Sequence, residues 1–300
     1  MSERLRRFHE GWGWDAWRCL GAWPATKGRQ AGFCFRLWAP RARQVQVVGD
    51  FSHWQPIALS PQGGDMERCW LGFVPDVQVG QLYKFRIQGC DGQITERSDP
   101  FARGSELRPG SASRIVDPSA YSWGDAAWLK RRKRWDFRDA PLAIYELHLG
   151  SWRRHEDGRM MSYREVAEPL IAHVRALGFT HVEFLPLAEH PYDPSWGYQV
   201  TGYFAPTSRH GSADDLRFLV DALHQAGIGA IVDWVPAHFP RDEHGLQRFD
   251  GAELYESPDP TVRDHPDWGT LVFDFCRPQV RSFLVASACY WIEELHFDGL

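Results

Sequence analysis

The chain has 300 residues, of which 43% are hydrophobic and 24% charged, and its formal net charge at pH 7 is −5. This balance is typical of a folded globular protein and argues against a disordered or membrane-embedded chain. The negative net charge opposes contact with a phosphate backbone, so we expect no nucleic-acid partner. The one basic run, residues 130–134, fits a solvated surface better than a nucleic-acid site.

The length leaves room for two domains, since one domain usually takes about 100–200 residues. The six cysteines form no CxxC pair and no regular framework, which indicates neither a zinc site nor a disulfide scaffold. Reduced thiols and a cytoplasmic location are expected. The N-terminus has no apolar run of the kind found in signal peptides, and no later stretch reaches about 18 apolar residues, so we expect no membrane partner.

The first third of the chain is predicted to form strands. After an N-terminal extension, residues 1–31, short apolar or alternating runs occur at 33–38, 44–48, 69–73 and 82–87. Turn signals at 63–65 and 91–92 separate these runs at short intervals. The pattern predicts a β-sandwich over residues 32–116.

A different rhythm follows a Pro-, Ser- and Trp-rich linker at 117–141. Apolar strands are predicted at 143–149, 181–187 and 229–235, and a helix follows each of them. Ser162 with Glu165, and Ser212 with Asp215, mark the starts of the first two helices, and the third runs over 278–295. This alternation predicts a parallel sheet, the first half of a (β/α)8 TIM barrel over 142–300 that stops at the start of strand four.

Polar residues that follow the parallel strands are the candidates for a substrate site, because ligands meet such a barrel at the carboxyl ends of its strands. His148 follows the first strand, the sequence Trp-Gly-Tyr-Gln with Tyr198 follows the second, and Asp233 and His238 follow the third. The long segment 236–277, rich in Asp, Pro and Gly, is too long for a plain connection and is predicted to be a functional excursion.

Several of these motifs together resemble glycoside hydrolase family 13, in the form found in its branching enzymes. The segments that carry the resemblance are residues 145–152, 178–183, 196–206, 233–240, 249–251 and 254–256. Upstream, residues 37–40, 48–54 and 80–85 resemble a family-48 carbohydrate-binding module. The resemblance extends from about residue 18 to 300 and keeps the family order.

The resemblance implies an enzyme that cleaves α-1,4 links in a glucan such as glycogen or amylose and transfers the freed segment to a 6-hydroxyl. It implies substrate-binding roles for Tyr198, Asp233 and His238. His148, and Trp54 and Lys84 of the β module, are possible further contacts to glucan. No cofactor is implied.

A metal site is not expected either, because Ala237 stands where many α-amylases have a calcium-related Asn. The nucleophile and the general acid of the family are expected beyond Leu300, so residues 1–300 alone are predicted to be inactive.

Two alternatives stay open at this point. One is another enzyme of family 13, such as a maltooligosyltrehalose trehalohydrolase or a debranching enzyme, which shares the β module and the barrel. Residues 150–154 and 235–240 resemble the branching enzymes more closely. The other is a non-catalytic glucan-binding fragment. The sequence does not indicate an oligomeric state.

Overall fold

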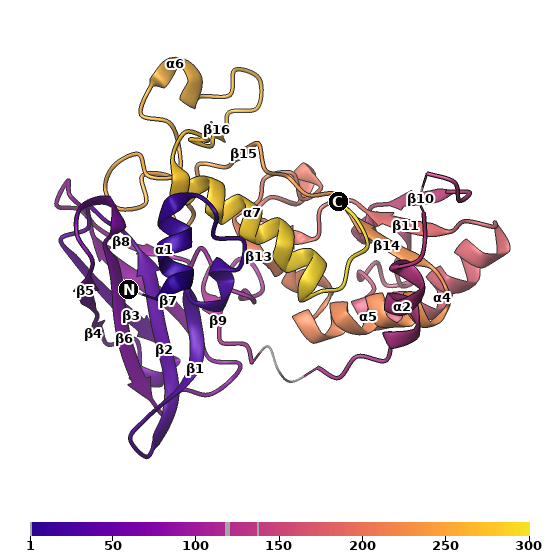
Figure 1. Ribbon diagram of the computed structural model, residues 1–300, viewed down its shortest axis with the longest axis horizontal. Helices are drawn as coiled ribbons and strands as arrows, with labels where there is room; N and C mark the ends of the chain where they lie inside the picture. Colours follow the sequence, from indigo (N-terminus) through magenta and orange to yellow (C-terminus); the bar gives the residue numbers. More distant parts are fainter. Residues whose placement is uncertain (1, 118–120, 137) are drawn as a thin grey trace.

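The computed structural model describes residues 2–117, 121–136 and 138–300. Figure 1 shows a β-rich module at one end of the molecule and an α/β region at the other, with helix α7 (Pro278–Glu293) running between them. This arrangement confirms the predicted fold class, a β-sandwich followed by a parallel α/β region.

The β module consists of two antiparallel sheets. One has the order β1-β2-β6-β5, and the other has the order β4-β3-β7-β8, with β9 also paired to β7. Along β7 the side chains Tyr83, Phe85 and Ile87 are buried and alternate with more exposed neighbours, as expected for a strand with one face on a core. The strand bounds are β1 Gly21–Lys27, β2 Gln30–Trp38, β3 Gln44–Gly49, β4 Ile57–Ala58, β5 Ser60–Gln62, β6 Cys69–Pro75, β7 Leu82–Gln88, β8 Ile94–Arg97 and β9 Ser113–Arg114.

The predicted start of the sandwich at residue 32 is corrected by the structure, because strand β1 already begins at Gly21. It pairs with β2 from Gly21 to Lys27, through a hairpin whose turn contains Gly28 in the left-handed region, φ 63°. The sequence pattern did not predict this strand, because it contains Pro24 and its second half is largely exposed and carries polar residues.

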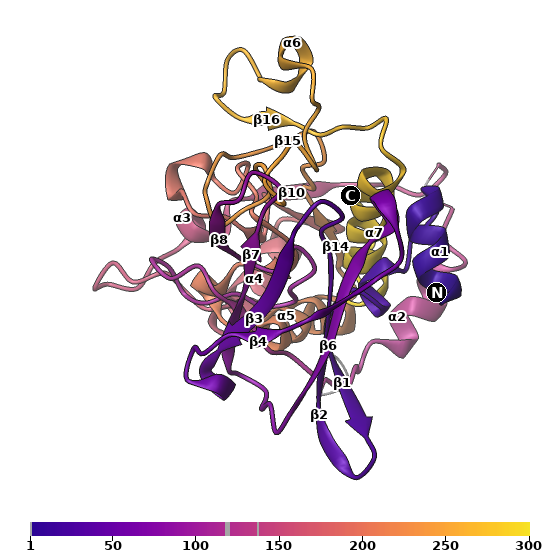
Figure 2. The same ribbon diagram turned by 90° about the vertical axis from the view of Figure 1, so that its left-hand side faces the viewer.

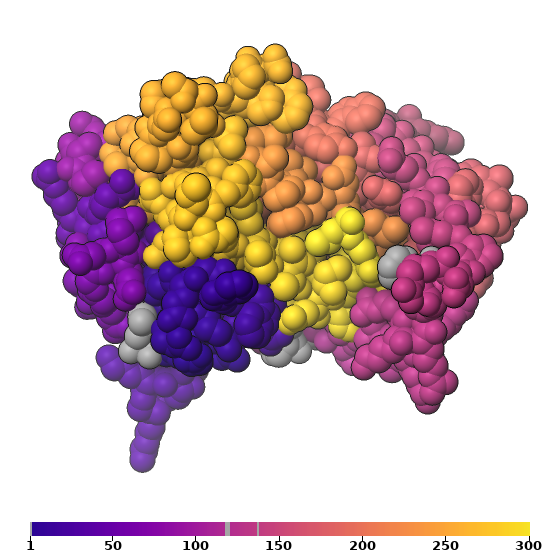
Figure 3. All heavy atoms as spheres, turned by 45° about the horizontal axis from the view of Figure 1, so that its top comes forward, coloured from indigo at the N-terminus to yellow at the C-terminus, as the bar shows by residue number. Residues whose placement is uncertain are grey.

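The residues before β1, predicted as an extension, fold onto the rest of the protein. They form helix α1 (Glu3–Glu10) and the 3-10 turn η1 (Ala16–Arg18). Phe8 is fully buried and packs edge-on against Trp38 and Phe101. The backbone N–H of Gly13 donates to Ser282 Oγ on α7 at 3.0 Å. Figure 3 shows these indigo residues lying directly against the yellow C-terminal residues of the chain.

The predicted linker 117–141, of which residues 118–120 and 137 lie outside the described residues, contains helix α2 (Ala126–Arg132). It is anchored to the α/β region. Asp125 contacts His224 Nδ1 at 2.9 Å and His296 Nδ1 at 2.8 Å. Arg132, from the basic run, pairs with Asp298 at 2.9 Å. The segment is therefore more than a connection, because polar and charged contacts fix it to His224 and to the last residues of the chain.

The α/β region contains the three predicted parallel strands in one sheet of order β10-β11-β14. Gly299 forms a parallel bridge with Ile231, so the last residues lie beside β14 as the fourth-strand prediction requires. Capping boxes are present at Ser162 and Ser212, which confirms both predicted helix starts. The bounds are β10 Ile144–Leu147, α3 Leu149–Trp152, α4 Tyr163–Ala176, β11 His181–Phe184, β12 Ala188–Glu189, β13 Gly202–Pro206, α5 Ala213–Gln225 and β14 Gly229–Val232.

The segment after β14 has little regular structure, only β15 (His238–Phe239), α6 (Pro260–Arg263) and β16 (Leu271–Val272). Figures 1 and 2 show α6 and its flanking loops standing away from the rest of the molecule. Among the residues that the structure describes, no helix is both long enough and apolar enough to cross a membrane.

The β module and the α/β region have a common hydrophobic core. Phe101, from the end of the β module, stacks on Phe204 of β13 with ring centroids 4.8 Å apart and meets Phe283 of α7 edge-on at 5.3 Å. A buried ion pair, Arg41 with Asp250 at 3.1 Å, adds a polar link. The module and the region are therefore joined by packing as well as by the chain.

Candidate functional site

Two of the predicted substrate-binding residues meet at the carboxyl ends of the parallel strands. The Tyr198 hydroxyl donates a hydrogen bond to Asp233 Oδ2 at 2.5 Å. Asp233 directly follows β14, and its backbone N–H donates to the carbonyl of Phe184 at 2.8 Å, which ties it to the neighbouring strand. Tyr198 remains 39% exposed, so its ring is accessible to a ligand.

Three carboxylates give this end of the sheet a negative environment. Glu146 and Glu183 are paired in register on neighbouring strands. Partial burial, then the charges of Glu146 and Asp233, raise the pKa of Glu183. Burial and the bond to Asp233 raise the pKa of Tyr198, so its phenol stays protonated and serves as a donor.

A stacked aromatic pair lies beside these residues. His148, which follows β10, stacks on Trp196 with ring centroids 5.2 Å apart and planes 12° from parallel. The Trp196 side chain is 53% exposed. His148 Nδ1 also contacts Ser151 Oγ at 2.9 Å, and partial burial lowers the pKa of its imidazole. Sequence reasoning missed Trp196 as a site residue, although it lies two residues before Tyr198 in the same motif.

A buried ion-pair network holds the segment that carries Trp196 and Tyr198. Arg209, whose side chain is 7% exposed, contacts Glu189 at 2.7 Å and Asp193 at 2.7 Å. Asp193 begins the short turn η4 (Asp193–Ser195), and the backbone N–H of Trp196 donates to its carbonyl at 2.9 Å. Charge-assisted bonds of this kind fix geometry strongly, so Arg209 is a positioning residue for this segment.

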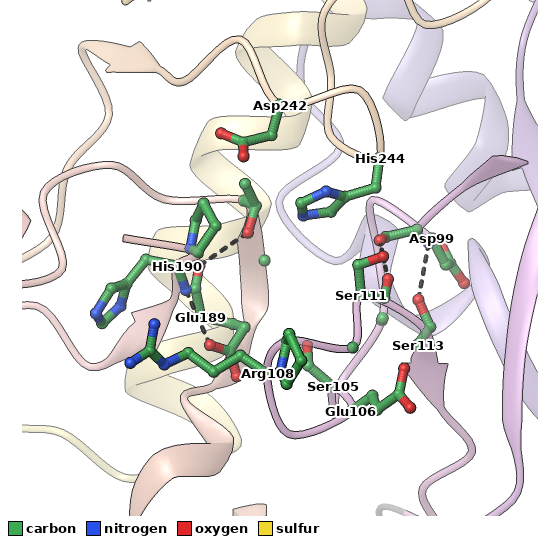
Figure 4. A pocket seen from close by; sticks show the side chains of 17 residues that line it. Asp99, Ser105, Glu106, Arg108, Ser111, Ser113, Glu189, His190, Asp242 and His244 are labelled. Atoms are coloured by element: carbon green, nitrogen blue, oxygen red, sulfur yellow. Dashed lines mark hydrogen bonds between the residues drawn. The ribbon is translucent and has the colours of Figure 1, made fainter. Parts of the chain in front are cut away.

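The β module also reaches this segment. Arg108 pairs with Asp193, and Ser208 Oγ donates to the carbonyl of Glu106 at 3.1 Å. Between the β module and the α/β region lies a polar cavity of about 370 Å³ (Figure 4). Asp242 and His244 enter it from the segment after β14, and Glu189 and His190 form its opposite wall. No sequence motif indicates this cavity, because its walls come from distant segments of the chain.

His238 is buried, and its ring contacts among the described residues are to other residues of the excursion rather than to Tyr198 or Asp233. Its ring lies 4.9 Å from that of Trp268 and 6.0 Å from that of His265. Burial and the nearby His265 lower its pKa, so the imidazole is neutral at pH 7. Its Nδ1 is buried and has no hydrogen-bond partner within the described residues.

The two candidate residues of the β module lie elsewhere. Trp54 is 40% exposed, and its indole N–H donates to Asp50 Oδ1 at 3.1 Å. Lys84 Nζ donates to Ser111 Oγ at 3.0 Å. Ser111 borders the cavity between the β module and the α/β region, so Lys84 is occupied at this junction, whereas Trp54 presents its ring to solvent.

Comparison with known proteins agrees with this architecture. Residues 19–102 match the family model of carbohydrate-binding module 48, the isoamylase N-terminal domain. The fold resembles a putative alpha amylase from Salmonella typhimurium, with a TM-score of 0.73 and 25% identity over 94% of this chain and 43% of that one. It also resembles the pullulanase from Bacillus acidopullulyticus, with a TM-score of 0.71 and 22% identity over 93% of this chain and 37% of that one. These likenesses define the class: a carbohydrate-binding module joined to the α/β region of the amylase-like enzymes.

The curated relatives narrow this class to the 1,4-alpha-glucan branching enzymes. The chain is 50% identical to GlgB of Thiobacillus denitrificans over 99% of its own length and 40% of the relative. It is 51% identical to GlgB of Dechloromonas aromatica over 100% of its length and 48% of that relative. The chain is thus similar to the N-terminal portion of these 1,4-alpha-glucan branching enzymes, and it spans less than half the length of the two relatives.

Proposed function

We propose that this chain is the α-glucan-binding N-terminal portion of a 1,4-α-glucan branching enzyme. The observation that carries the proposal is the hydrogen bond between Tyr198 and Asp233 at the carboxyl ends of the parallel strands. Ligands meet barrels of this type at that end, and the relatives of the chain are named for branching activity. Glycogen and amylose are the proposed substrates.

In this proposal Tyr198 supplies an aromatic face beneath one glucose ring, and Asp233 holds the phenol in place. His238, whose Nδ1 has no hydrogen-bond partner within the described residues, bonds another hydroxyl of the glucan. These contacts favour a ring distorted toward the oxocarbenium geometry of the transition state. Trp196 and His148 extend the aromatic surface along the glucan.

The chemistry of a retaining transfer needs two more carboxyl groups, one as nucleophile and one as general acid, about 5 Å apart. We propose that both lie outside residues 1–300. The nucleophile forms a glycosyl ester as the α-1,4 link breaks and the acid protonates the leaving oxygen. The 6-hydroxyl of an acceptor chain then attacks the ester and gives its proton to the carboxylate that acted as acid, the bond to the nucleophile breaks, and an α-1,6 link forms with retention.

The alternatives predict different products. Another enzyme of the same fold class would hydrolyse amylose or existing branches, and a purely binding fragment would release no new chain ends. We further propose a cytoplasmic location, which the six unpaired cysteines support, because disulfides are rare there.

The test uses a chimera in which residues 1–300 replace the matching portion of the Thiobacillus denitrificans relative. The chimera is incubated with amylose, and the branches are counted after treatment with a debranching enzyme. New α-1,6 links at a rate near that of the relative support the proposal. A folded chimera that only hydrolyses amylose, or that does nothing, contradicts it. Residues 1–300 alone are expected to form no branches.

A further inference from the structure

A second cleft, remote from the strand ends, is built from guanidinium groups. It has a volume of about 550 Å³ and lies between the first turns of α1, the turn η1 and the strands β1 and β2. Arg4, Arg7, Arg18 and Arg36 all line it, and Trp23 forms a section of its wall. Nothing in the proposed reaction uses these residues, because a glucan carries no charge.

The arginines of this cleft are only partly compensated. Arg4 and Arg7 share one carboxylate, Asp15, with contacts of 2.9 Å each. Arg18 pairs with Glu294 at 2.7 Å and with Glu293 at 3.5 Å. Among the described residues, Arg36 has no carboxylate within ion-pair distance; its guanidinium donates from Nη1 to the carbonyl of Cys19, at 3.0 Å.

The other polar groups of the cleft do not neutralise this charge. Among the described residues that line it, Glu3 is the one carboxylate, and Glu3 is paired with Arg6 at 2.6 Å. Cys19 and Cys34 also line the cleft. Burial raises the pKa of the Cys19 thiol to about 11 and also raises the pKa of Cys34, so both thiols are neutral at pH 7.

Two of the arginines that line the cleft each have one nitrogen donor without an acceptor within the described residues. The Nε groups of Arg7 and Arg36 are buried, and neither has a hydrogen-bond partner within the described stretches of the chain. A buried donor without an acceptor is unfavourable, so a ligand whose oxygen atoms reach these guanidinium groups is favoured. Phosphate oxygens match the fork of guanidinium donors better than hydroxyl groups do.

We propose that this cleft binds a phosphate-bearing anion, with Arg36 at its centre and Arg4, Arg7 and Arg18 around it. Its volume accommodates a pyrophosphate group and a portion of the molecule attached to it. Trp23, whose ring is covered on one face by the Arg103 guanidinium at 3.8 Å, offers a wall for an attached sugar or base. Arg18 also pairs with Glu293, the last residue of α7, and with Glu294 directly after it, so the bound anion joins the N-terminal helix, the β module and the α/β region.

The test is a calorimetric titration of residues 1–300 with pyrophosphate at low ionic strength. We expect saturable binding to one site that weakens as salt is added. Arg36→Gln should reduce the affinity for pyrophosphate about tenfold or more, because the variant loses one pair of charge-assisted hydrogen bonds to the anion. Arg29→Gln, which removes an exposed arginine from the β1–β2 turn, is the matched control and should leave the affinity unchanged.

Because Arg36 also bonds Cys19, its variant is first checked for an unchanged melting temperature. If Arg36→Gln is unfolded, the affinity of Arg4→Gln for pyrophosphate is measured instead, since the Arg4 side chain is 51% exposed and its loss does not disturb the core. The proposal is overturned if the folded variant, Arg36→Gln or Arg4→Gln, binds pyrophosphate as tightly as Arg29→Gln does. It is also overturned if residues 1–300 show no saturable binding at millimolar pyrophosphate.

Two further titrations, with ADP and with glucose 6-phosphate, distinguish the source of the phosphate. Tighter binding of ADP than of pyrophosphate indicates a nucleotide whose base contacts Trp23, and tighter binding of glucose 6-phosphate indicates a sugar phosphate. None of these outcomes depends on branching activity, so the cleft and the proposed function are tested separately.

Discussion

Tyr198 and Asp233, the two residues that carry the proposed glucan site, are joined to each other at the ends of the parallel strands. The phenol donates to a carboxylate that is itself tied to the neighbouring strand through its backbone, so neither group needs to reorganise when a sugar binds. Tyr198 as a whole remains 39% exposed.

Replacing Tyr198 or His238 by Ala should therefore lower turnover more than stability. In the chimera, each change should raise the activation free energy by about 2–4 kcal/mol, by analogy with other preorganised contacts to a transition state. Branching rates and melting temperatures are measured together. Tyr192→Ala is the control, since the Tyr192 side chain is 54% exposed and lies outside the proposed sugar contacts. Full branching activity in either variant would show that its assigned role is wrong.

Glu183 gives a prediction that depends on pH. Its folded-state pKa is raised by burial and by its acidic neighbours, so the folded protein binds this proton more tightly than the unfolded chain does. The ionised carboxylate thus destabilises the fold once the pH rises through the folded pKa, and the penalty is absent below the unfolded pKa.

Glu183→Gln should accordingly raise the melting temperature at pH 7 and leave it almost unchanged near pH 4. Thermal unfolding at both pH values measures this difference. A variant that is stabilised equally at the two values, or destabilised at pH 7, would contradict the assigned repulsion.

At the scale of elements, the segment from β12 to η4 is held by side chains rather than by regular structure. β12 and β13 are joined by only a short irregular ladder, and Arg209 bridges Glu189 and Asp193 behind them. Arg209 thus replaces the backbone hydrogen bonds that a longer strand would provide.

Arg209→Met should cost about 3–5 kcal/mol of unfolding free energy, because it leaves the Glu189 carboxylate buried without its partner. Arg241→Met is the matched control. Arg241 and Asp264 are paired on the surface, with both side chains 41% exposed, and such pairs are worth less than about 1 kcal/mol. Chemical denaturation of the two variants measures the difference, and equal losses would refute a structural role for the buried network.

At the scale of the whole molecule, the aromatic contacts of Phe101 unite the β module and the α/β region into a single packing unit. Phe101 is 4% exposed and touches Phe8, Phe204 and Phe283, which come from three separate segments. Because the β module and the α/β region have this core in common, the unfolding of one is coupled to the unfolding of the other.

We therefore expect one calorimetric unfolding transition for residues 1–300. Phe101→Ala should move that whole transition to lower temperature, with a loss of about 3–5 kcal/mol, whereas Val79→Ala, at a 60% exposed position, should have little effect. Two resolved transitions, of which Phe101→Ala shifts only one, would instead support an independently folding sandwich.

The features that depend on neighbouring residues could be predicted from the sequence alone. Strand alternation, the capping boxes at Ser162 and Ser212, and the motif around Asp233 are local patterns, and they were sufficient to predict the fold class and to assign Tyr198 to a strand-end site. The early strand β1 and helix α2 were missed because their burial depends on distant partners.

The contacts between segments far apart in the chain became known only from the folded structure. The Arg209 network, the stacking of Trp196 on His148, the docking of α1 and the arginine cleft each combine side chains from separate elements. The free energy of a charged side chain depends on its burial and on its partners, and neither is fixed by the neighbouring residues in the sequence. Tertiary packing therefore determines where these charges are paired and where they stay open to a ligand.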